Sequence, residues 1–341
     1  MTLGQLVALL GGTLEGSGDT LVSRVATLDA AGPGELSFLH NVRYRHQLSS
    51  TRAAAVIVAP SDAALTTRPR IVAANPYAYM ARAAALLSPA VRPAPGVHPG
   101  ASVHPGASVA ADAWVDAGCV VGAGAEIGAR AVIGPGCTVG EQAVIGEDSV
   151  LHTRVSVYHD CRVGARCVLH AGVVVGADGF GFAEEEGRWV KVPQLGRAVL
   201  GDDVELGANT CIDRGTLGDT VVEEGVKMDN LIQVGHNVLV GAHTAIAACA
   251  GIAGSTRIGR HCKIGGAAMI HGHITLCDHA VVAAGTMVRR SIEVPGVYDG
   301  FFPALPHREW MKNLAHFNRL GEIADSVRRL ERNHGAEGAD K

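Results

Sequence analysis

Residues 97–133 read VHPGASVHPGASVAADAWVDAGCVVGAGAEIGARAVI, and every sixth residue in them is valine or isoleucine, from Val97 to Ile133. The period continues to Val175, resumes over 200–212 and runs again over 222–294. Six matches neither the 3.6-residue period of a helix nor the two-residue period of a lone strand. It is typical of a solenoid with three short strands per coil and ~18 residues per turn. The pattern therefore predicts a mainly β chain whose aliphatic residues stack along the inside of a prism.

A second inward position follows each aliphatic residue by four places and holds only small side chains in the first coils. Five cysteines occupy it: Cys119, Cys137, Cys161, Cys167 and Cys262. Because a free cysteine behaves as a small apolar group, we interpret these thiols as packing residues. No CxxC pair is present, so a zinc site is not expected. Glycine often follows the aliphatic residue, as at Gly122, which predicts unusual backbone angles there.

Composition excludes several classes of protein. The 341 residues include 44 glycines, 4% aromatic and 18% charged residues, with a formal net charge of −4. A nucleic-acid binder is disfavoured because such proteins are usually basic. No run of apolar residues is long enough for a membrane span. The start, MTLGQLVALLGG, lacks the basic region and long apolar stretch of a signal peptide, so we expect a cytoplasmic protein.

Two segments flank the repeats. Residues 1–96 lack the period and are expected to form a small α/β domain, with helices over 2–10 and 76–87, strands over 35–39 and 53–59, and a helix near 44–50 between them. Asn75 is expected to cap the helix that begins at Pro76. The solenoid is assigned to 97–297. Residues 303–335 are expected to form a helical tail, because apolar residues recur there at spacings of three and four.

The period breaks twice. The first break, between Val175 and Leu200, contains Phe180, Phe182 and Trp189, which is a high concentration of rings for this chain. The second, between Ile212 and Val222, contains DRGTLGDT. Long excursions from a solenoid often form its functional face. The alternative is a loop that packs on its own aromatic residues.

One stretch of the repeats suggests chemistry, MDNLIQVGHNVLVG over 228–241. His236 follows the inward Val234 by two places, which puts it at a face or corner of the prism. Gly254 is 18 residues further, one coil on and ~4.8 Å away, and His273 lies near the next coil. A base beside a backbone N–H is the minimal set for acyl transfer. The alternative is a solvated corner histidine.

Long motifs along the chain resemble one family. They are LSFLHNVRYRHQL, GADGFGFA, KVPQLGR, IDRGTLGDT, KMDNLIQVGHNV, GRHCKIGGAAMIHGHI and EVPGVYDG. Together they resemble the UDP-3-O-(3-hydroxyacyl)glucosamine N-acyltransferases of lipid A synthesis, which are hexapeptide-repeat enzymes. This resemblance implies a left-handed parallel β-helix, a homotrimer with active sites between adjacent prisms, and an acyl carrier protein as the acyl donor. The acceptor is implied to be the 2-amino group of a UDP-sugar already acylated at O3.

The resemblance also implies residue roles. His236 corresponds to the general base, Asp229 to a residue that orients it or raises its basicity, Gly254 to an oxyanion donor and His273 to a residue of the same cleft. The implied uridine site consists of Phe38, Asn41 and Tyr44.

Two further roles are expected at the C-terminal end of the repeats. Met287 is a candidate to limit acyl-chain length, with simple surface packing as the alternative. Arg289 and Arg290 are expected to dock the acidic carrier protein, because complementary charge raises encounter rates.

Four other functions remain open at this point. They are the related O-acyltransferase of lipid A synthesis, an acetyl-CoA-dependent sugar acetyltransferase, a zinc-dependent hexapeptide carbonic anhydrase, and a structural scaffold without activity. A 96-residue first domain that carries a uridine site argues against the O-acyltransferase. Metal analysis would separate the carbonic anhydrase from the rest.

Overall fold

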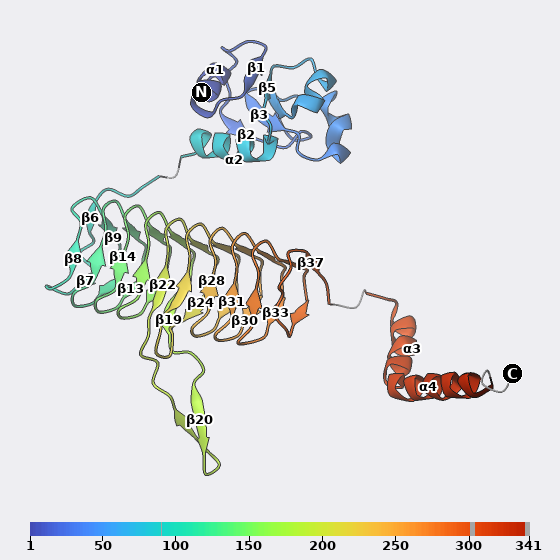
Figure 1. Cartoon of the computed structure of the whole chain (residues 1–341). Coiled ribbons are helices and arrows are strands. Elements are labelled where there is room, and N and C mark those ends of the chain that lie inside the picture. The colour runs from blue at the N-terminus through green and yellow to red at the C-terminus, as the bar shows by residue number, and fades with distance from the viewer. Residues whose placement is uncertain (90, 301–303, 338–341) are drawn as a thin grey trace. The chain divides into compact units, whose positions relative to one another are not determined.

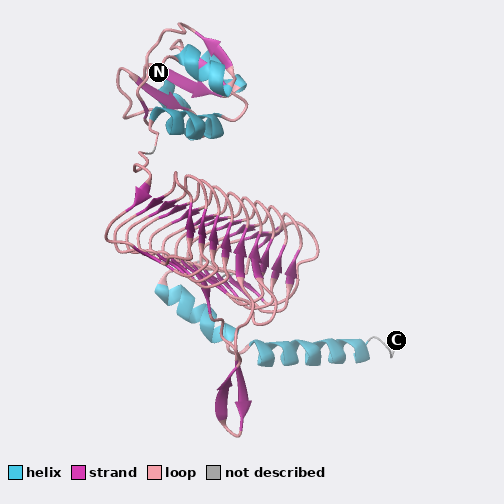
Figure 2. Ribbon diagram, turned by 90° about the vertical axis from the view of Figure 1, so that its left-hand side faces the viewer, coloured by secondary structure: helices cyan, strands magenta, loops and turns pink. Residues whose placement is uncertain are grey.

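The computed structural model of the chain describes residues 1–89, 91–300 and 304–337. Contacts divide the chain into two compact units, Met1–Arg92 and Pro93–Lys341. Most of the second unit is a β-solenoid (Figures 1 and 2). The prediction of a mainly β solenoid built from hexapeptide repeats is confirmed.

The first unit is a five-stranded sheet with helices packed on it. The strand order is β1-β5-β4-β3-β2, with β1 antiparallel to β5 and the other pairs parallel. The strands are β1 (Thr13–Glu15), β2 (Arg24–Val25), β3 (Glu35–Phe38), β4 (Ala55–Val58) and β5 (Arg70–Val72). The helices are α1 (Leu3–Leu10) and α2 (Pro76–Leu87), with 3-10 helices η1 (Val42–Leu48) and η2 (Pro60–Leu65).

Capping explains the helix boundaries of this unit. Thr2 and Gln5 form a reciprocal capping box at the start of α1, and the Asn75 side chain accepts from the Ala78 N–H at the start of α2. Both predicted α-helices are confirmed. The helix predicted near 44–50 is a 3-10 helix that starts two residues earlier, because Asn41 Oδ1 accepts from the Arg43 N–H and caps it there.

The solenoid consists, within the described residues, of three parallel sheets of ten, nine and eleven strands. Sheet 1 contains β7 (Ser102–Val103), β10 (Val120–Val121), β13 (Thr138–Val139), β16 (Ser156–Val157), β19 (Val174–Ala177), β24 (Cys211–Asp213), β27 (Gln233–Val234), β30 (Gly251–Ile252), β33 (Met269–Ile270) and β36 (Met287–Val288). Sheet 2 contains β8 (Ser108–Val109), β11 (Glu126–Ile127), β14 (Val144–Ile145), β17 (Arg162–Val163), β22 (Ala198–Leu200), β25 (Thr220–Val222), β28 (Leu239–Val240), β31 (Arg257–Ile258) and β34 (Thr275–Leu276). Sheet 3 contains β6 (Gly96–Val97), β9 (Trp114–Val115), β12 (Val132–Ile133), β15 (Val150–Leu151), β18 (Val168–Leu169), β23 (Glu205–Leu206), β26 (Lys227–Met228), β29 (Ala245–Ile246), β32 (Lys263–Ile264), β35 (Val281–Val282) and β37 (Val297–Tyr298).

The register follows the predicted 18-residue coil. Val121 pairs with Val139, for example, and Val234 with Ile252. These aliphatic residues are buried, and so are the five cysteines of the small slot. A continuous core of stacked aliphatic side chains therefore holds the coils together.

Glycines such as Gly122 were predicted to follow the aliphatic residues because of unusual backbone angles, and that reason is wrong. The positive φ angles fall two residues later, for example at Gly124 (65°) and Arg130 (56°). At Gly122 an added Cβ would lie 2.7 Å from the Glu141 nitrogen of the next coil. Glycine is used there because the backbone of the next coil approaches too closely for a side chain.

The ends of the solenoid depart from the predicted phase. Val97, in the first coil, is 46% exposed because no earlier coil covers it. Val294 was expected to point inward, yet it is 65% exposed and Ile292 is buried in its place. Ile292 bridges to Leu276, so the last coil is two residues short.

The first break in the period forms a β-hairpin. Strands β20 (Phe182–Glu185) and β21 (Arg188–Lys191) pair with each other and project away from the coils (Figures 1 and 2). Phe180, Phe182 and Trp189 are exposed on it.

The tail is helical, as predicted, and consists of two helices, α3 (His307–Phe317) and α4 (Leu320–Glu337). Its apolar residues, such as Trp310 and Leu314, are exposed within this chain. Pro303, where the predicted tail begins, lies outside the described residues. No helix in the described part of the chain combines the length and apolar character needed to cross a bilayer.

Candidate active site

His236 lies at the corner that follows β27, partly exposed, while Val234 before it is buried. The next coil brings Gly254 against its ring. The Ser255 N–H donates to the His236 carbonyl at 2.9 Å, and a Cβ added at Gly254 would lie 2.7 Å from His236 Nε2. Only a glycine at this place leaves the Nε2 edge of the imidazole open.

Gly254 is the second residue of its corner, residues 253–255. The hydrogen bonds between successive coils use the N–H groups of Ala253 and Ser255 but not that of Gly254. At three other corners an acidic side chain accepts from the equivalent amide. Ala165 donates to Asp202 at 2.9 Å, Ala242 to Glu223 at 2.9 Å and Arg260 to Asp278 at 2.8 Å. Among the described residues, none accepts a recorded hydrogen bond from the Gly254 N–H. A backbone donor therefore lies unused beside the imidazole.

The other ring nitrogen faces two oxygen atoms. His236 Nδ1 lies 3.0 Å from Asn237 Oδ1 and 3.3 Å from Thr216 Oγ1. The Thr216 hydroxyl in turn donates to Gln194 Oε1 at 3.0 Å. Thr216 belongs to the second break in the period and Gln194 to the first, so both breaks supply groups to this histidine.

Asp213 adds negative charge near His236. Burial raises the pKa of this carboxyl, while a hydrogen bond from Gln233 and attraction to His236 lower it, and Asp178 raises it. Asp178 pairs with Lys191 of the hairpin at 2.6 Å. An imidazolium formed at His236 is thus stabilised by an ionised Asp213.

Arg214, next to Asp213, anchors both ends of the first break. Its guanidinium is buried and donates to the Gly196 carbonyl at 2.8 Å and the His159 carbonyl at 2.9 Å. Its backbone N–H donates to the Ala177 carbonyl at 2.8 Å. The excursion that delivers Gln194 is therefore fixed to the coil that carries Asp213.

An apolar groove leads away from the histidine along sheet 1. Gln233, Gly251, Met269 and Met287 are paired in register on successive coils and line a cavity of about 560 Å³. Met287 is 64% exposed at the end of this row. Gln233, at the first coil of this row, hydrogen-bonds the Asp213 carboxyl, which in turn interacts with His236.

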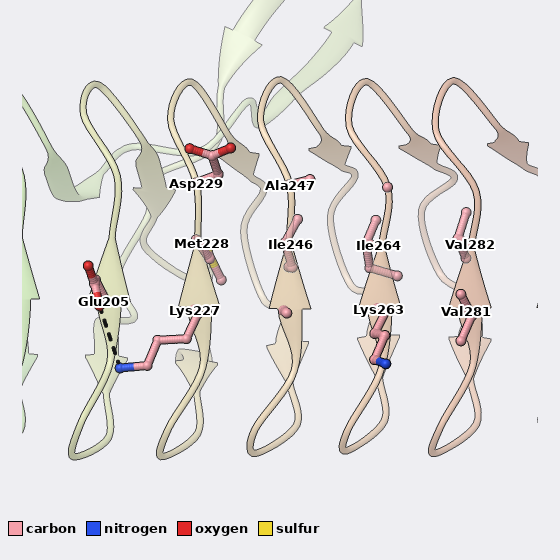
Figure 3. Close-up of a pocket in the computed structure, with 12 residues that line it drawn as sticks. Glu205, Lys227, Met228, Asp229, Ile246, Ala247, Lys263, Ile264, Val281 and Val282 are labelled. Atoms are coloured by element: carbon pink, nitrogen blue, oxygen red, sulfur yellow. Dashed lines mark ion pairs between the residues drawn. The ribbon is translucent and has the colours of Figure 1, made fainter. Parts of the chain in front are cut away.

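Asp229 is not among the recorded partners of His236. It follows β26 on sheet 3, and its Oδ1 accepts from the N–H and the side-chain amide of Asn230 at 2.8 and 2.9 Å. Figure 3 shows it with Lys227 and Lys263 along a pocket of about 630 Å³ on this sheet. His273 is closer to Gly254, since its N–H donates to the Gly254 carbonyl at 3.1 Å, and its side chain is exposed.

The three predicted uridine-site residues share one cavity in the first unit. Phe38, Asn41 and Tyr44 line a volume of about 440 Å³ together with Thr27 and Asp29. The Thr27 side chain hydrogen-bonds the Asp29 carboxyl and lowers its pKa, so this acceptor is ionised at neutral pH. The cavity offers rings, an amide and a carboxylate to a ligand.

Arg289 and Arg290 are exposed directly after the buried Val288. No group of three or more His, Cys, Asp or Glu is placed to hold a metal ion within the described ranges.

Sequence reasoning missed four residues around His236, namely Gln194, Asp213, Thr216 and Asn237. Three of them lie in the two phase breaks, and Asn237 is the neighbour of His236 in the chain. The breaks were a signal for the region, but no spacing rule relates their residues to His236.

Comparisons with known proteins place the chain among acyltransferases. Residues 19–86 match the family described as UDP-3-O-(3-hydroxymyristoyl) glucosamine N-acyltransferase, LpxD. Residues 106–141 and 142–177 match the bacterial transferase hexapeptide family, and 255–290 match the hexapeptide repeat of succinyl-transferase.

Curated relatives named UDP-3-O-acylglucosamine N-acyltransferase align over nearly the whole chain. The protein of Janthinobacterium sp. (strain Marseille) is 50% identical over 97% of this chain and 96% of its own. That of Delftia acidovorans is 51% identical over 97% and 95%, and that of Coxiella burnetii (strain Dugway 5J108-111) is 42% identical over 97% and 97%.

Among solved structures, the Francisella novicida UDP-N-acetylglucosamine acyltransferase matches with a TM-score of 0.50 and 20% identity. The match covers 64% of this chain and 73% of that one. This likeness concerns the fold alone.

Proposed function

The chain belongs to the UDP-3-O-acylglucosamine N-acyltransferase family of lipid A biosynthesis, and from this premise we propose that the His236–Gly254 pair carries out its acyl transfer. The observation that supports this proposal most is the open Nε2 edge of His236 beside the unused Gly254 N–H. One group can take a proton and the other can bind a developing negative charge, as acyl transfer requires.

In the proposed mechanism the 2-amino group of the UDP-sugar attacks the carbonyl carbon of a 3-hydroxyacyl thioester. Nε2 of His236 takes the proton that the amine loses as the C–N bond forms. The carbonyl oxygen becomes an oxyanion, which the Gly254 N–H binds. The C–S bond then breaks and the thiolate leaves, taking its proton from the imidazolium. Asp213 stabilises that imidazolium while it exists. No cofactor takes part in these steps.

The groove of sheet 1 is proposed to hold the acyl chain. Gly251 has no side chain to fill the groove, and an added Cβ there would lie 2.7 Å from Met269 Sδ. Met287 lies three coils from Gln233, a length of ~14 Å at ~4.8 Å per coil. We propose that its side chain limits the chain length, and Met287→Ala should then shift the preferred substrate towards longer acyl chains.

The cavity of the first unit is proposed to bind the uridine part of the substrate. Phe38 and Tyr44 supply ring surfaces for the base. Asn41 supplies an amide, although its Oδ1 already accepts from the Arg43 N–H, which leaves the amide nitrogen for the ligand.

We further propose a homotrimer with its sites between adjacent prisms. Asp229 lies on sheet 3 and has no recorded contact with His236 of its own chain, so a role in that site requires a second copy. His273 lines the cleft from the coil beyond Gly254. The exposed apolar residues of α3 and α4, such as Phe317, support association of copies. Light scattering that gives a monomer mass at micromolar concentration would contradict this proposal.

The acyl donor is proposed to be the thioester of an acyl carrier protein in the cytoplasm, docked on the exposed Arg289 and Arg290. Steady-state assays with carrier-bound and coenzyme A-bound 3-hydroxyacyl groups test this donor. The double variant Arg289→Glu/Arg290→Glu should raise KM for the carrier substrate and spare KM for the UDP-sugar. Equal use of both donors, with no effect of the double reversal, would favour a donor other than the carrier protein.

A further inference from the structure

We infer that Asn237 fixes the tautomer of His236, holding the proton on Nδ1 so that Nε2 is the basic atom. This inference rests on the proposed role of His236 and names the residue that prepares it. The evidence is the direction of the hydrogen bonds around Nδ1, which follows from backbone groups whose donor or acceptor character is fixed.

The orientation of the Asn237 side chain is set by two backbone groups. Its Oδ1 accepts from the Thr216 N–H at 3.0 Å, and its Nδ2 donates to the Gly218 carbonyl at 3.0 Å. A flipped amide would face the N–H with a donor and the carbonyl with an acceptor, so only one orientation satisfies both. The atom 3.0 Å from His236 Nδ1 is therefore an oxygen that can only accept.

The contact between Thr216 and Nδ1 also indicates a proton on Nδ1. Gln194 Nε2 donates to the Val192 carbonyl at 3.0 Å, which leaves Gln194 Oε1 as an acceptor. The Thr216 hydroxyl donates its hydrogen bond to that oxygen at 3.0 Å. It therefore presents only a lone pair to Nδ1, which lies 3.3 Å away. Nδ1 thus faces two acceptors and must carry a proton. In the neutral imidazole, Nε2 is then the unprotonated nitrogen.

The chain conformation explains why asparagine stands here. Residue 237 has a φ of 60°, a left-handed angle that asparagine adopts more readily than most residues. Its N–H donates to Thr220 Oγ1 at 2.8 Å, which ties the corner to the second break. The side chain lies on a rigid support and acts on substrate only through His236, as a positioning residue.

A charged side chain also acts on His236. Asp213 is an acidic group that interacts with His236, and Asp178 acts on Asp213 in turn, with Lys191 paired to Asp178. Asp213 has no recorded hydrogen bond to the ring, so it stabilises the cation without choosing the tautomer. Two tasks often given to one carboxylate are divided here between Asp213 and Asn237.

The test is a ring ¹⁵N NMR measurement of His236 in the full chain, assigned by difference from His236→Ala. We expect the wild-type ring at neutral pH to show Nδ1 protonated and Nε2 not. Asn237→Gly removes the side chain without backbone strain, because glycine tolerates the left-handed angle. This variant should show a mixture of tautomers, and kcat should fall about tenfold, which is less than the ~10²–10⁴-fold loss expected when a general base is removed.

Two variants sharpen this test. Asn237→Asp keeps an acceptor but makes it anionic, which favours the imidazolium, so it should move the acidic limb of the kcat/KM profile about one pH unit higher or more. Thr216→Val should have a smaller effect than Asn237→Gly, since its contact is longer and Asn237 keeps the backbone bond to residue 216. Asn209→Gly is the matched control, an asparagine with a φ of 57° at another corner, and it should change neither signal nor rate.

The inference is overturned if the wild-type ring carries its proton on Nε2, or if Asn237→Gly leaves both tautomer and rate unchanged. These outcomes differ from failure of the proposed function. If His236→Ala retains near-wild-type turnover, His236 is not the base, whatever the NMR spectrum shows. The tautomer is read without activity, so the two results are independent.

Discussion

Two corners of the solenoid share one backbone and differ in chemistry. The corner proposed to be catalytic, called the catalytic corner below, comprises residues 235–237, 253–255 and 271–273. The histidine corner comprises residues 241–243, 259–261 and 277–279. Both have left-handed third residues, with φ of 60° at Asn237 and 58° at His243. In the histidine corner the rings stack on one another, with centroids 5.2 Å apart for His243 and His261 and 5.1 Å for His261 and His279.

The two corners differ in the residue at the second position and in the side chains that surround it. His236 is the second residue of its corner and covers a glycine, whereas the stacked histidines are third residues. Two second amides of the histidine corner, those of Ala242 and Arg260, are capped by Glu223 and Asp278, while no acceptor is found for that of Gly254 among the described residues. Three of the four groups around His236, namely Gln194, Asp213 and Thr216, come from the two breaks in the period. The comparison teaches that the repeat builds equivalent corners, and that a site arises where the repeat is interrupted.

The largest expected effect is at the base itself. His236→Ala should lower kcat/KM by ~10²–10⁴-fold, because it removes the proton acceptor, and should leave the thermal transition nearly unchanged. His243→Ala at the histidine corner is the matched control and should retain activity. A steady-state assay beside thermal unfolding checks both. Comparable activity in the two variants would remove the distinction between the corners.

Gly254→Ala closes the open edge of the imidazole. The methyl group would lie 2.7 Å from Nε2, so the ring must move and substrate must lose its approach. The expected loss in kcat is about 10²-fold, comparable with loss of an oxyanion donor. The fold should survive, because Ala242 occupies the same place at the histidine corner. Full activity in a folded variant would show that neither Nε2 nor this amide is used.

Asp213→Asn tests charge near the base. It should lower kcat/KM about tenfold, because the imidazolium loses a neighbouring negative charge.

The stability of Asp213→Asn should not fall with its activity. Burial raises the pKa of Asp213, so the folded state binds this proton more tightly than the unfolded state does. Stability is then lost as the pH rises from the usual aspartate pKa through the raised one. The variant avoids that loss, and its Tm at neutral pH should equal or slightly exceed that of the parent. A lower Tm that accompanies lower activity would assign Asp213 a structural role.

The smallest effect is expected at a capped corner. Asp278→Ala leaves the Arg260 N–H without its acceptor and should cost less than about 1 kcal/mol, since water can replace the carboxylate at an exposed site. Activity should not change. Chemical denaturation with a parallel transferase assay measures both quantities. A large loss of activity would mean that the histidine corner is coupled to the catalytic one.

Much of the fold could be predicted from the sequence because its signals are local. The hexapeptide period predicted the coils, and caps such as Asn75 predicted helix boundaries. The short strands β1, β2 and β5 of the first unit carry too few residues for a pattern. At the end of the solenoid, a shift of two residues placed Ile292 inside where Val294 was expected, since the last coil need not match a coil beyond it.

For the site, the sequence by itself determined that His236 and Gly254 adjoin, because 18 residues make one coil and the period holds between them. It could not determine what surrounds Nδ1. Gln194, Asp213 and Thr216 lie in segments without a period, whose paths depend on the buried guanidinium of Arg214 and on contacts between distant parts of the chain. Only the tertiary structure decided that an asparagine, and not Asp229 of the same chain, contacts the base. Spacing along a repeat specifies which residues stack, but the direction of a hydrogen bond depends on atoms that folding brings together.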